Sequence, residues 1–172
     1  RPYPDGWEKR IDAGPARYDI RPIRPADIAL YSDFLARIAP DDIRFRFLAQ
    51  RKSFPHQMLV RLTQLDYARE MAFVALDAIT GELAAVGRLS SDPDREKAEY
   101  ALLVRTDLQG RGLGWALLSQ LVDYARSEGI RRIEGYVLAD NEKMLALCRE
   151  FGFSVAPSET EPGLCVAALD LA

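Results

Sequence analysis

A glycine-rich turn at residues 109–114 is the segment whose residue types point most directly to chemistry. Gly110, Gly112 and Gly114 follow an apolar run that ends at Val104, and an amphipathic helical pattern begins within the turn. Glycine lets the backbone turn tightly and approach a ligand closely. The start of a helix leaves several N–H groups unpaired and carries the positive end of the helix dipole. The pattern therefore predicts a strand–turn–helix junction that is suited to bind a phosphate group.

Other phosphate-binding turns require residues that this one lacks. A Walker A loop ends in Gly-Lys-Ser/Thr, whereas Gly114 is followed here by Trp115. A dinucleotide-binding fingerprint read from Gly110 and Gly112 requires a small residue where Trp115 stands, although Asp140 is near the place of its acidic residue. A helix start with turn glycines and no ligand remains an alternative.

The flanking sequence predicts one α/β (α+β) domain over residues 18–172, with a mixed, twisted central sheet flanked by helices. Strand residues are expected at 18–24, 71–76, 83–89, 98–104, 132–138, 155 and 164–169. Helices are expected at 25–39, 41–48, 55–65, 113–128 and 141–151. Pro22 indicates that residues 18–24 form an edge strand, because proline donates no ladder hydrogen bond. Residues 1–17 lack periodicity and are expected to form an arm or linker.

Composition and charge exclude several classes of protein. The 172 residues carry a formal net charge of -3, which argues against nucleic acid as a partner bound through bulk positive charge. No apolar run reaches the length of a membrane span, and nothing resembles a signal peptide. Cys148 and Cys165 make neither a disulfide framework nor a metal-ligand cluster, so no metal and a cytoplasmic location are expected. The start at Arg1 suggests a processed chain or a fragment of a multidomain protein.

Two motifs resemble those of the GNAT acetyltransferase superfamily. The spacing Gln109-x-x-Gly112-x-Gly114 resembles its coenzyme A pyrophosphate loop. Residues 141–153, which end in Gly-Phe, resemble its later helix motif. The resemblance extends from about Tyr18 to the end of the chain.

Three further segments are similar to the acetyltransferase domain of bacterial Pat-type protein lysine acetyltransferases. They are Ile20–Asp27, Arg44–Phe47 and Leu62–Ala72. In many members of that family this domain is fused to a region similar to an ADP-forming acyl-CoA synthetase. No such region is present in this sequence, which fits an excised domain or a stand-alone relative.

The resemblance implies how acetyl-CoA would bind. The central strands 98–104 and 132–138 would splay apart, and pantetheine would pair with the backbone of Leu102 and Val104, with Leu103 between them. Arg111 would add charge at the pyrophosphate. Asn141 would either contact pantetheine or cap its helix. The backbone amides expected to hold the pyrophosphate are those of Gln109, Gly110, Arg111, Gly112, Leu113, Gly114 and Trp115.

Glu99 is the candidate general base. A carboxylate within a strand is unusual unless it faces solvent or has a function. The Pat-type resemblance places the catalytic glutamate at this position, between Ala98 and Tyr100. A solvent-facing glutamate paired with Lys97 or Arg88 is the alternative.

The proton donor for the departing thiolate is left open by the sequence. Many GNAT enzymes have a tyrosine seven residues after the helix asparagine, whereas this chain has Cys148 there. Cys148 is expected to be a small core residue, so that water protonates coenzyme A or the thiolate leaves unaided. The N–H of Val104 or Leu103 is expected to donate to the oxygen on which negative charge develops.

The resemblance thus implies an acetyl-CoA-dependent N-acetyltransferase that modifies a protein lysine. The implied acceptor is a metabolic enzyme such as acetyl-CoA synthetase, attacked directly with Glu99 as base. Two alternatives remain: an N-acetyltransferase for a small amine or amino acid, and a non-catalytic acyl-CoA-binding regulatory module.

Overall fold

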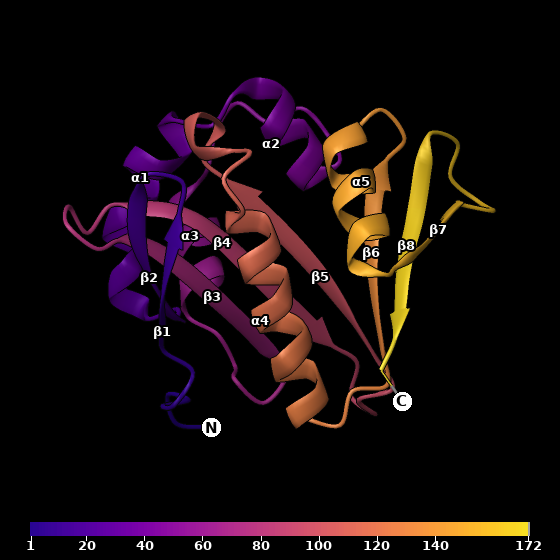
Figure 1. Ribbon diagram of the computed structural model, residues 1–172, viewed down its shortest axis with the longest axis horizontal. Helices are drawn as coiled ribbons and strands as arrows, with labels where there is room; N and C mark the ends of the chain where they lie inside the picture. The colour runs from indigo at the N-terminus through magenta and orange to yellow at the C-terminus, as the bar shows by residue number, and fades with distance from the viewer. Residues whose placement is uncertain (172) are drawn as a thin grey trace.

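A single eight-stranded sheet runs through the computed structural model, which describes residues 1–171; residue 172 of the predicted domain lies outside the described residues. Its strand order is β1-β2-β3-β4-β5-β6-β8-β7 (Figure 1). The strands are β1 (Lys9–Ala13), β2 (Ala16–Pro22), β3 (Glu70–Asp77), β4 (Leu83–Ser91), β5 (Lys97–Val104), β6 (Arg132–Leu138), β7 (Ser154–Pro157) and β8 (Leu164–Asp170). Neighbouring strands are antiparallel except β5 and β6, which are parallel. The predicted mixed sheet is therefore confirmed.

The parallel strands β5 and β6 are joined at one end only. Their pairing covers residues 97–99 against 132–134. β6 pairs with β8 along its full length, so beyond Glu99 the sheet divides into two parts that diverge in Figure 1. The splayed central strands expected from the family resemblance are present.

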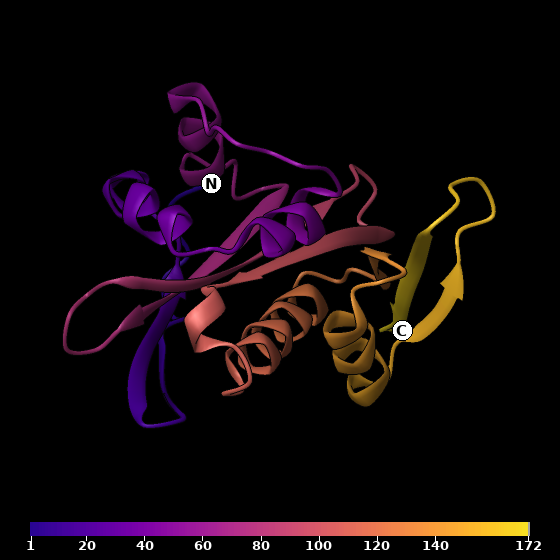
Figure 2. The same cartoon turned by 90° about the horizontal axis from the view of Figure 1, so that it is seen from above.

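Helices cover both faces of the sheet (Figure 2). α4 (Leu113–Ser127) and α5 (Glu142–Phe151) lie on one face. α1 (Ile28–Ala36), α2 (Pro40–Phe47) and α3 (His56–Thr63) lie on the other. Two short 3-10 turns, η1 (Pro25–Asp27) and η2 (Thr106–Leu108), complete the chain, so the helix predicted to start at Pro25 begins as a 3-10 turn.

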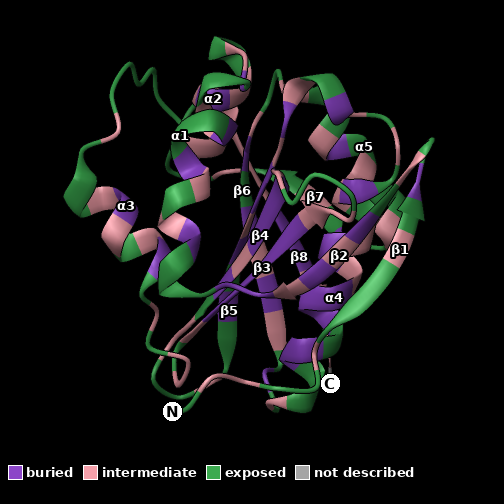
Figure 3. Ribbon diagram, turned by 90° about the vertical axis from the view of Figure 1, so that its left-hand side faces the viewer, coloured by how far each residue is buried: buried purple, intermediate pink, exposed green. Residues whose placement is uncertain are grey.

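Each face of the sheet has its own hydrophobic core, because side chains alternate along a strand. In β3, Phe73 belongs to the core beneath α4, whereas Ala72 and Val74 belong to the core beneath α1 and α3. Burial on both faces explains the nearly continuous apolar sequence of β3 and β4. Figure 3 shows these central strands buried over most of their length.

The N-terminal region differs from the prediction. Residues 9–13, expected in an arm or linker, form β1, which pairs with residues 16–20 of β2. β2 also pairs with β3, so its prediction as an edge strand is wrong. Pro22 is tolerated because it ends β2, beyond the residues that pair with β1. The mostly exposed side chains of β1 explain why its sequence shows no apolar alternation.

Candidate active site

The gap between β5 and β6 presents one backbone edge of β5. The N–H of Arg105 donates to the carbonyl oxygen of Ala84 at 2.9 Å, and hydrogen bonding alternates along an antiparallel pair. The backbone of Leu103 therefore faces β4, whereas that of Leu102 and Val104 faces the gap. This edge is suited to pair with an extended ligand. Of the two expected donors to the charged oxygen, Val104 is the one whose N–H points into the gap.

The glycine turn leads directly into α4 at the open end of this gap. Gly110 and Gly112 have φ angles of 78° and 92°, a region that favours glycine. Gly112 is the N-cap of α4 and supplies no side-chain cap. Ala116 is the first residue of this helix whose N–H donates to a backbone carbonyl of the helix or its cap, the carbonyl oxygen of Gly112. The preceding amides, including those of Leu113, Gly114 and Trp115, therefore remain free to hold a phosphate.

The side chain of Gln109 holds the open end of the gap together. Its amide nitrogen donates to Asp42 Oδ2 at 3.0 Å, and its amide oxygen accepts from Lys143 Nζ at 3.4 Å. Asp42 lies on α2 and Lys143 on α5, so Gln109 connects helices from opposite faces of the sheet. An ion pair of 2.7 Å between Arg44 and Asp140 makes a second connection. These contacts could not be predicted from the sequence, because their partners are distant along the chain.

Two arginines near the turn have different environments. Arg105 forms a two-point ion pair with Asp107, at 2.9 and 2.7 Å, so its charge is already matched. Arg111 packs its aliphatic part against the β1–β2 turn, where a Cβ on Gly14 would lie 2.8 Å from Arg111 Cδ. No hydrogen bond or ion pair joins Arg111 to another described residue. Of the two, Arg111 is the one whose charge is available to a phosphate.

Arg111→Gln is expected to weaken coenzyme A binding about 10-fold, because a charge-assisted hydrogen bond contributes about 1.5 kcal/mol. Titration calorimetry with coenzyme A measures the change. Arg126→Gln, at the far exposed end of α4, removes the same charge and is the matched control. Equal affinity of the two variants would contradict a phosphate role for Arg111.

Glu99 lies where the pairing of β5 and β6 ends. It is exposed, and it is aligned with Ser90 of β4 and Glu134 of β6. Glu134 is held by Arg132 at 3.1 Å, whereas the carboxylate of Glu99 makes no ion pair or hydrogen bond with any residue from 1 to 171. The suggested pairing with Lys97 or Arg88 is thus not seen. An unpaired carboxylate at the closed end of the gap is placed to accept a proton from a bound amine.

The side chain of Tyr100 lies on the opposite face of β5, beneath the gap. Its ring lies over Gly135 of β6, where a Cβ would come 2.2 Å from Tyr100 Cε1. Its hydroxyl lies 2.8 Å from the sulfur of Cys148 on α5. Cys148 is fully buried, as predicted, and burial raises the pKa of its thiol. This thiol therefore packs and hydrogen-bonds with Tyr100.

Asn141 is the N-cap of α5, and its side-chain oxygen accepts from the N–H of Met144 at 3.3 Å. The oxygen thus serves the helix, which leaves the amide nitrogen for a ligand. Asn141→Ala is expected to lower the free energy of unfolding by about 1 kcal/mol, the usual contribution of such a cap. Denaturant unfolding measures this change. Asn141→Asp, which keeps a capping oxygen, should restore most of it, and equal loss in both variants would contradict the capping role.

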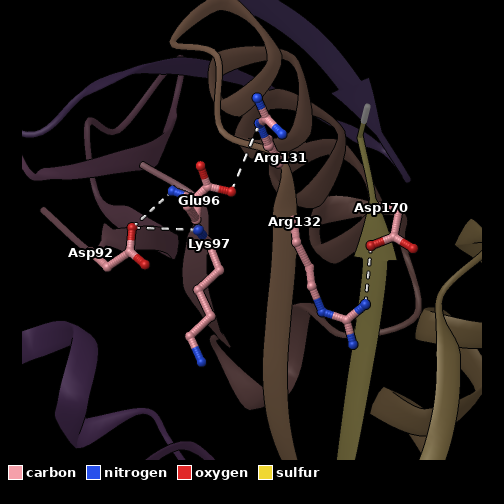
Figure 4. Close-up of a pocket in the computed structure, with 6 residues that line it drawn as sticks. All are labelled: Asp92, Glu96, Lys97, Arg131, Arg132 and Asp170. Carbon is pink, nitrogen blue, oxygen red and sulfur yellow. Dashed lines mark hydrogen bonds and ion pairs between the residues drawn. The ribbon is translucent and has the colours of Figure 1, made fainter. Parts of the chain in front are cut away.

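A polar hollow lies at the other, closed end of β5 and β6 (Figure 4). It is lined by Asp92, Glu96, Lys97, Arg131, Arg132 and Asp170. Most of these charges are already matched within the hollow: Arg132 pairs with Asp170 at 3.0 Å, and Asp92 accepts from two backbone N–H groups. The hollow therefore has little left to recognise a ligand.

Residues 1–171 hold neither a candidate metal site nor a candidate membrane-spanning helix. No group of three or more histidine, cysteine, aspartate or glutamate side chains there is arranged to hold a metal ion. No helix in the same range is long and apolar enough to cross a membrane.

Comparison with known proteins supplies the family. The Acetyltransferase (GNAT) family matches residues 39–153. Acetyltransferase PA5475 of Pseudomonas aeruginosa is 36% identical over 151 residues, which cover 87% of this chain and 81% of that protein. Acetyltransferase Pat of Mycolicibacterium smegmatis is 28% identical over 77% of this chain, which spans only 40% of that relative. The crystal structure of the GNAT domain of S. lividans PAT aligns with a TM-score of 0.89 and 28% identity, covering 98% of this chain and 99% of that one.

Proposed function

The chain belongs to the GNAT acetyltransferase family, and on that premise we propose that it transfers the acetyl group of acetyl-CoA to the ε-amine of a protein lysine. The observation that carries the choice of acceptor is the similarity to the GNAT domain of S. lividans PAT, which extends over nearly the whole of both chains. A metabolic enzyme such as acetyl-CoA synthetase is the proposed substrate protein. The proposed location is the cytoplasm, where the free thiols of Cys148 and Cys165 stay reduced.

In this proposal the edge of β5 and the start of α4 hold the acetyl donor. The backbone of Leu102 and Val104 pairs with the amide groups of pantetheine. The free amides at the start of α4, with Arg111, bind the pyrophosphate. These contacts place the thioester near the closed end of the gap, beside Glu99.

Glu99 acts on the acceptor amine. A lysine with an ordinary pKa of about 10.4 is almost entirely protonated at neutral pH and cannot attack. Glu99 accepts its proton, directly or through one water molecule, as the nitrogen forms a bond to the acetyl carbon. The carbon–sulfur bond then breaks, the nitrogen gives its second surplus proton to water, and water supplies the proton that the coenzyme A thiolate takes up.

The proposal is tested by incubating the protein with acetyl-CoA and purified acetyl-CoA synthetase, followed by mass spectrometry of the tryptic peptides. Acetylation of one lysine, with loss of synthetase activity, is the expected result. Slow, scattered acetylation that is independent of the added protein would contradict it. Tight acetyl-CoA binding without transfer to any protein or small amine would favour the regulatory module.

A further inference from the structure

Two arginines on the α1–α3 face of the sheet lie near Glu99 without a carboxylate partner of their own. Arg46 projects from the last turn of α2 and is half-buried. Its guanidinium has no ion pair or hydrogen bond with any residue that the structure describes. Arg88 of β4 is also half-buried, and it donates to the backbone carbonyl of Leu62 but forms no ion pair within residues 1–171. By contrast, half-buried Arg21 is matched by Asp27 at 2.7 Å.

The strand register places this pair beside the candidate base. Arg88 is aligned with Ala101, and Ser90 is aligned with Glu99, so Arg88 and Glu99 are diagonal neighbours on one face of the sheet. Such neighbours are about 7–8 Å apart, within reach of long side chains. α2 packs over β5 and thereby brings Arg46 over the same surface.

The surroundings of Arg46 hold its side chain in place and leave its charge unmatched. Its guanidinium stacks on the Phe47 ring, 4.6 Å from the ring centre, which leaves its N–H edges free. Burial, and to a smaller extent the nearby charge of Arg88, lower the pKa of Arg46 to about 10, while Tyr31 and Glu99 oppose the shift. Arg46 nevertheless stays protonated at neutral pH, so two cations share a partly desolvated site, an arrangement that an anion would stabilise.

We propose that Arg46 and Arg88 form a binding site for a carboxylate of the acceptor, held next to the amine that Glu99 deprotonates. The inference rests on the proposed function for the role of Glu99. The opposite charges of Glu99 and the arginine pair match a substrate that carries an ammonium and a carboxylate close together in space. That chemistry occurs in a lysine flanked by an acidic residue and in a free amino acid, and the test distinguishes these sources.

The first measurement detects the site without turnover. Arginine side-chain Nε–H signals are followed by NMR while sodium propionate is titrated, with propionamide as the neutral control and Arg46→Lys to assign the Arg46 signal. A saturable shift of this signal with propionate alone is expected. No selective shift of the Arg46 signal overturns the proposal, whatever the enzymatic activity of the protein.

The second measurement compares acceptors that differ by one charge. The pairs are acetyl-Glu-Lys-amide against acetyl-Gln-Lys-amide, and L-leucine against L-leucinamide, assayed with the wild type, Arg46→Gln and the control Arg51→Gln. Arg51 approaches the same Phe47 ring from an exposed position, so it tests long-range charge. We expect the wild type to favour the carboxylate form of one pair about 10-fold in kcat/KM, and Arg46→Gln to abolish that preference.

The outcomes separate the proposals. The pair that shows the preference identifies the source of the carboxylate, a flanking acidic residue or a free amino acid. A preference that Arg46→Gln leaves intact, or that Arg51→Gln reduces equally, overturns the anion site. If the wild type acetylates no acceptor, the proposed function fails, and the NMR titration alone decides whether the arginine pair binds a carboxylate.

Discussion

Glu99→Gln lowers kcat/KM for acetyl transfer by about 10²–10⁴-fold, the expected contribution of a positioned general base. The glutamine keeps the shape of the side chain but cannot accept a proton. Glu99 is exposed and unpaired within residues 1–171, so its replacement should leave the fold and the affinity for acetyl-CoA unchanged. Steady-state kinetics with the acetylated lysine as readout, together with calorimetry for acetyl-CoA, measures both effects.

Glu134→Gln is the matched control for this experiment. Glu134 is the carboxylate aligned with Glu99 across the β5–β6 pair, but Arg132 already engages it at 3.1 Å. A large loss of activity in Glu134→Gln and a small one in Glu99→Gln would exchange the roles of the two residues. The residual rate of Glu99→Gln should rise with pH, because the neutral fraction of a lysine with a pKa of about 10.4 rises about tenfold per unit below that value.

Gly135→Ala is expected to lower the free energy of unfolding by about 3 kcal/mol, at the upper end of the usual cost of overpacking a core. An added Cβ would lie 2.2 Å from Cε1 and 2.6 Å from Cζ of Tyr100. The ring cannot move away easily, because its hydroxyl lies against Cys148 and its edge packs on Phe153, with ring centres 5.6 Å apart. Chemical denaturation measures the change in free energy.

Gly114→Ala, and Gly135→Ala in a Tyr100→Ala background, test whether the ring of Tyr100 causes the loss of stability. Gly114→Ala places its Cβ at an ordinary 3.5 Å from Leu147, so its unfolding free energy should not fall. In a Tyr100→Ala background the clash is gone, and Gly135→Ala should then cost less than about 1 kcal/mol. An equal cost in both backgrounds would show that the ring of Tyr100 does not explain the destabilisation.

The structure revealed site features that were not predicted, among them the contact between Tyr100 and Gly135. Two properties of the sequence bear on this contact. The alternation of β5 places Tyr100 on the face opposite Glu99, and a glycine inside a strand, as at Gly135, often marks a close approach of another group. Neither signal says which group approaches. That Tyr100 lies over Gly135 follows from the parallel pairing of β5 and β6, which are separated by the turn and all of α4.

Features that depend on neighbouring residues could be predicted from the amino-acid sequence. Hydrophobic periodicity located the main strands and helices, and the glycines at 110 and 112 marked the turn that leads into α4, because backbone preferences and amphipathic patterns act over a few residues. Other features became visible only in the structure: β1 forms the sheet edge, the carboxylate of Glu99 has no partner within residues 1–171, and Arg46 lies near Glu99. These features depend on strand register and helix packing. Register and packing bring together side chains that are far apart in the chain, and the charges of those side chains then act on one another.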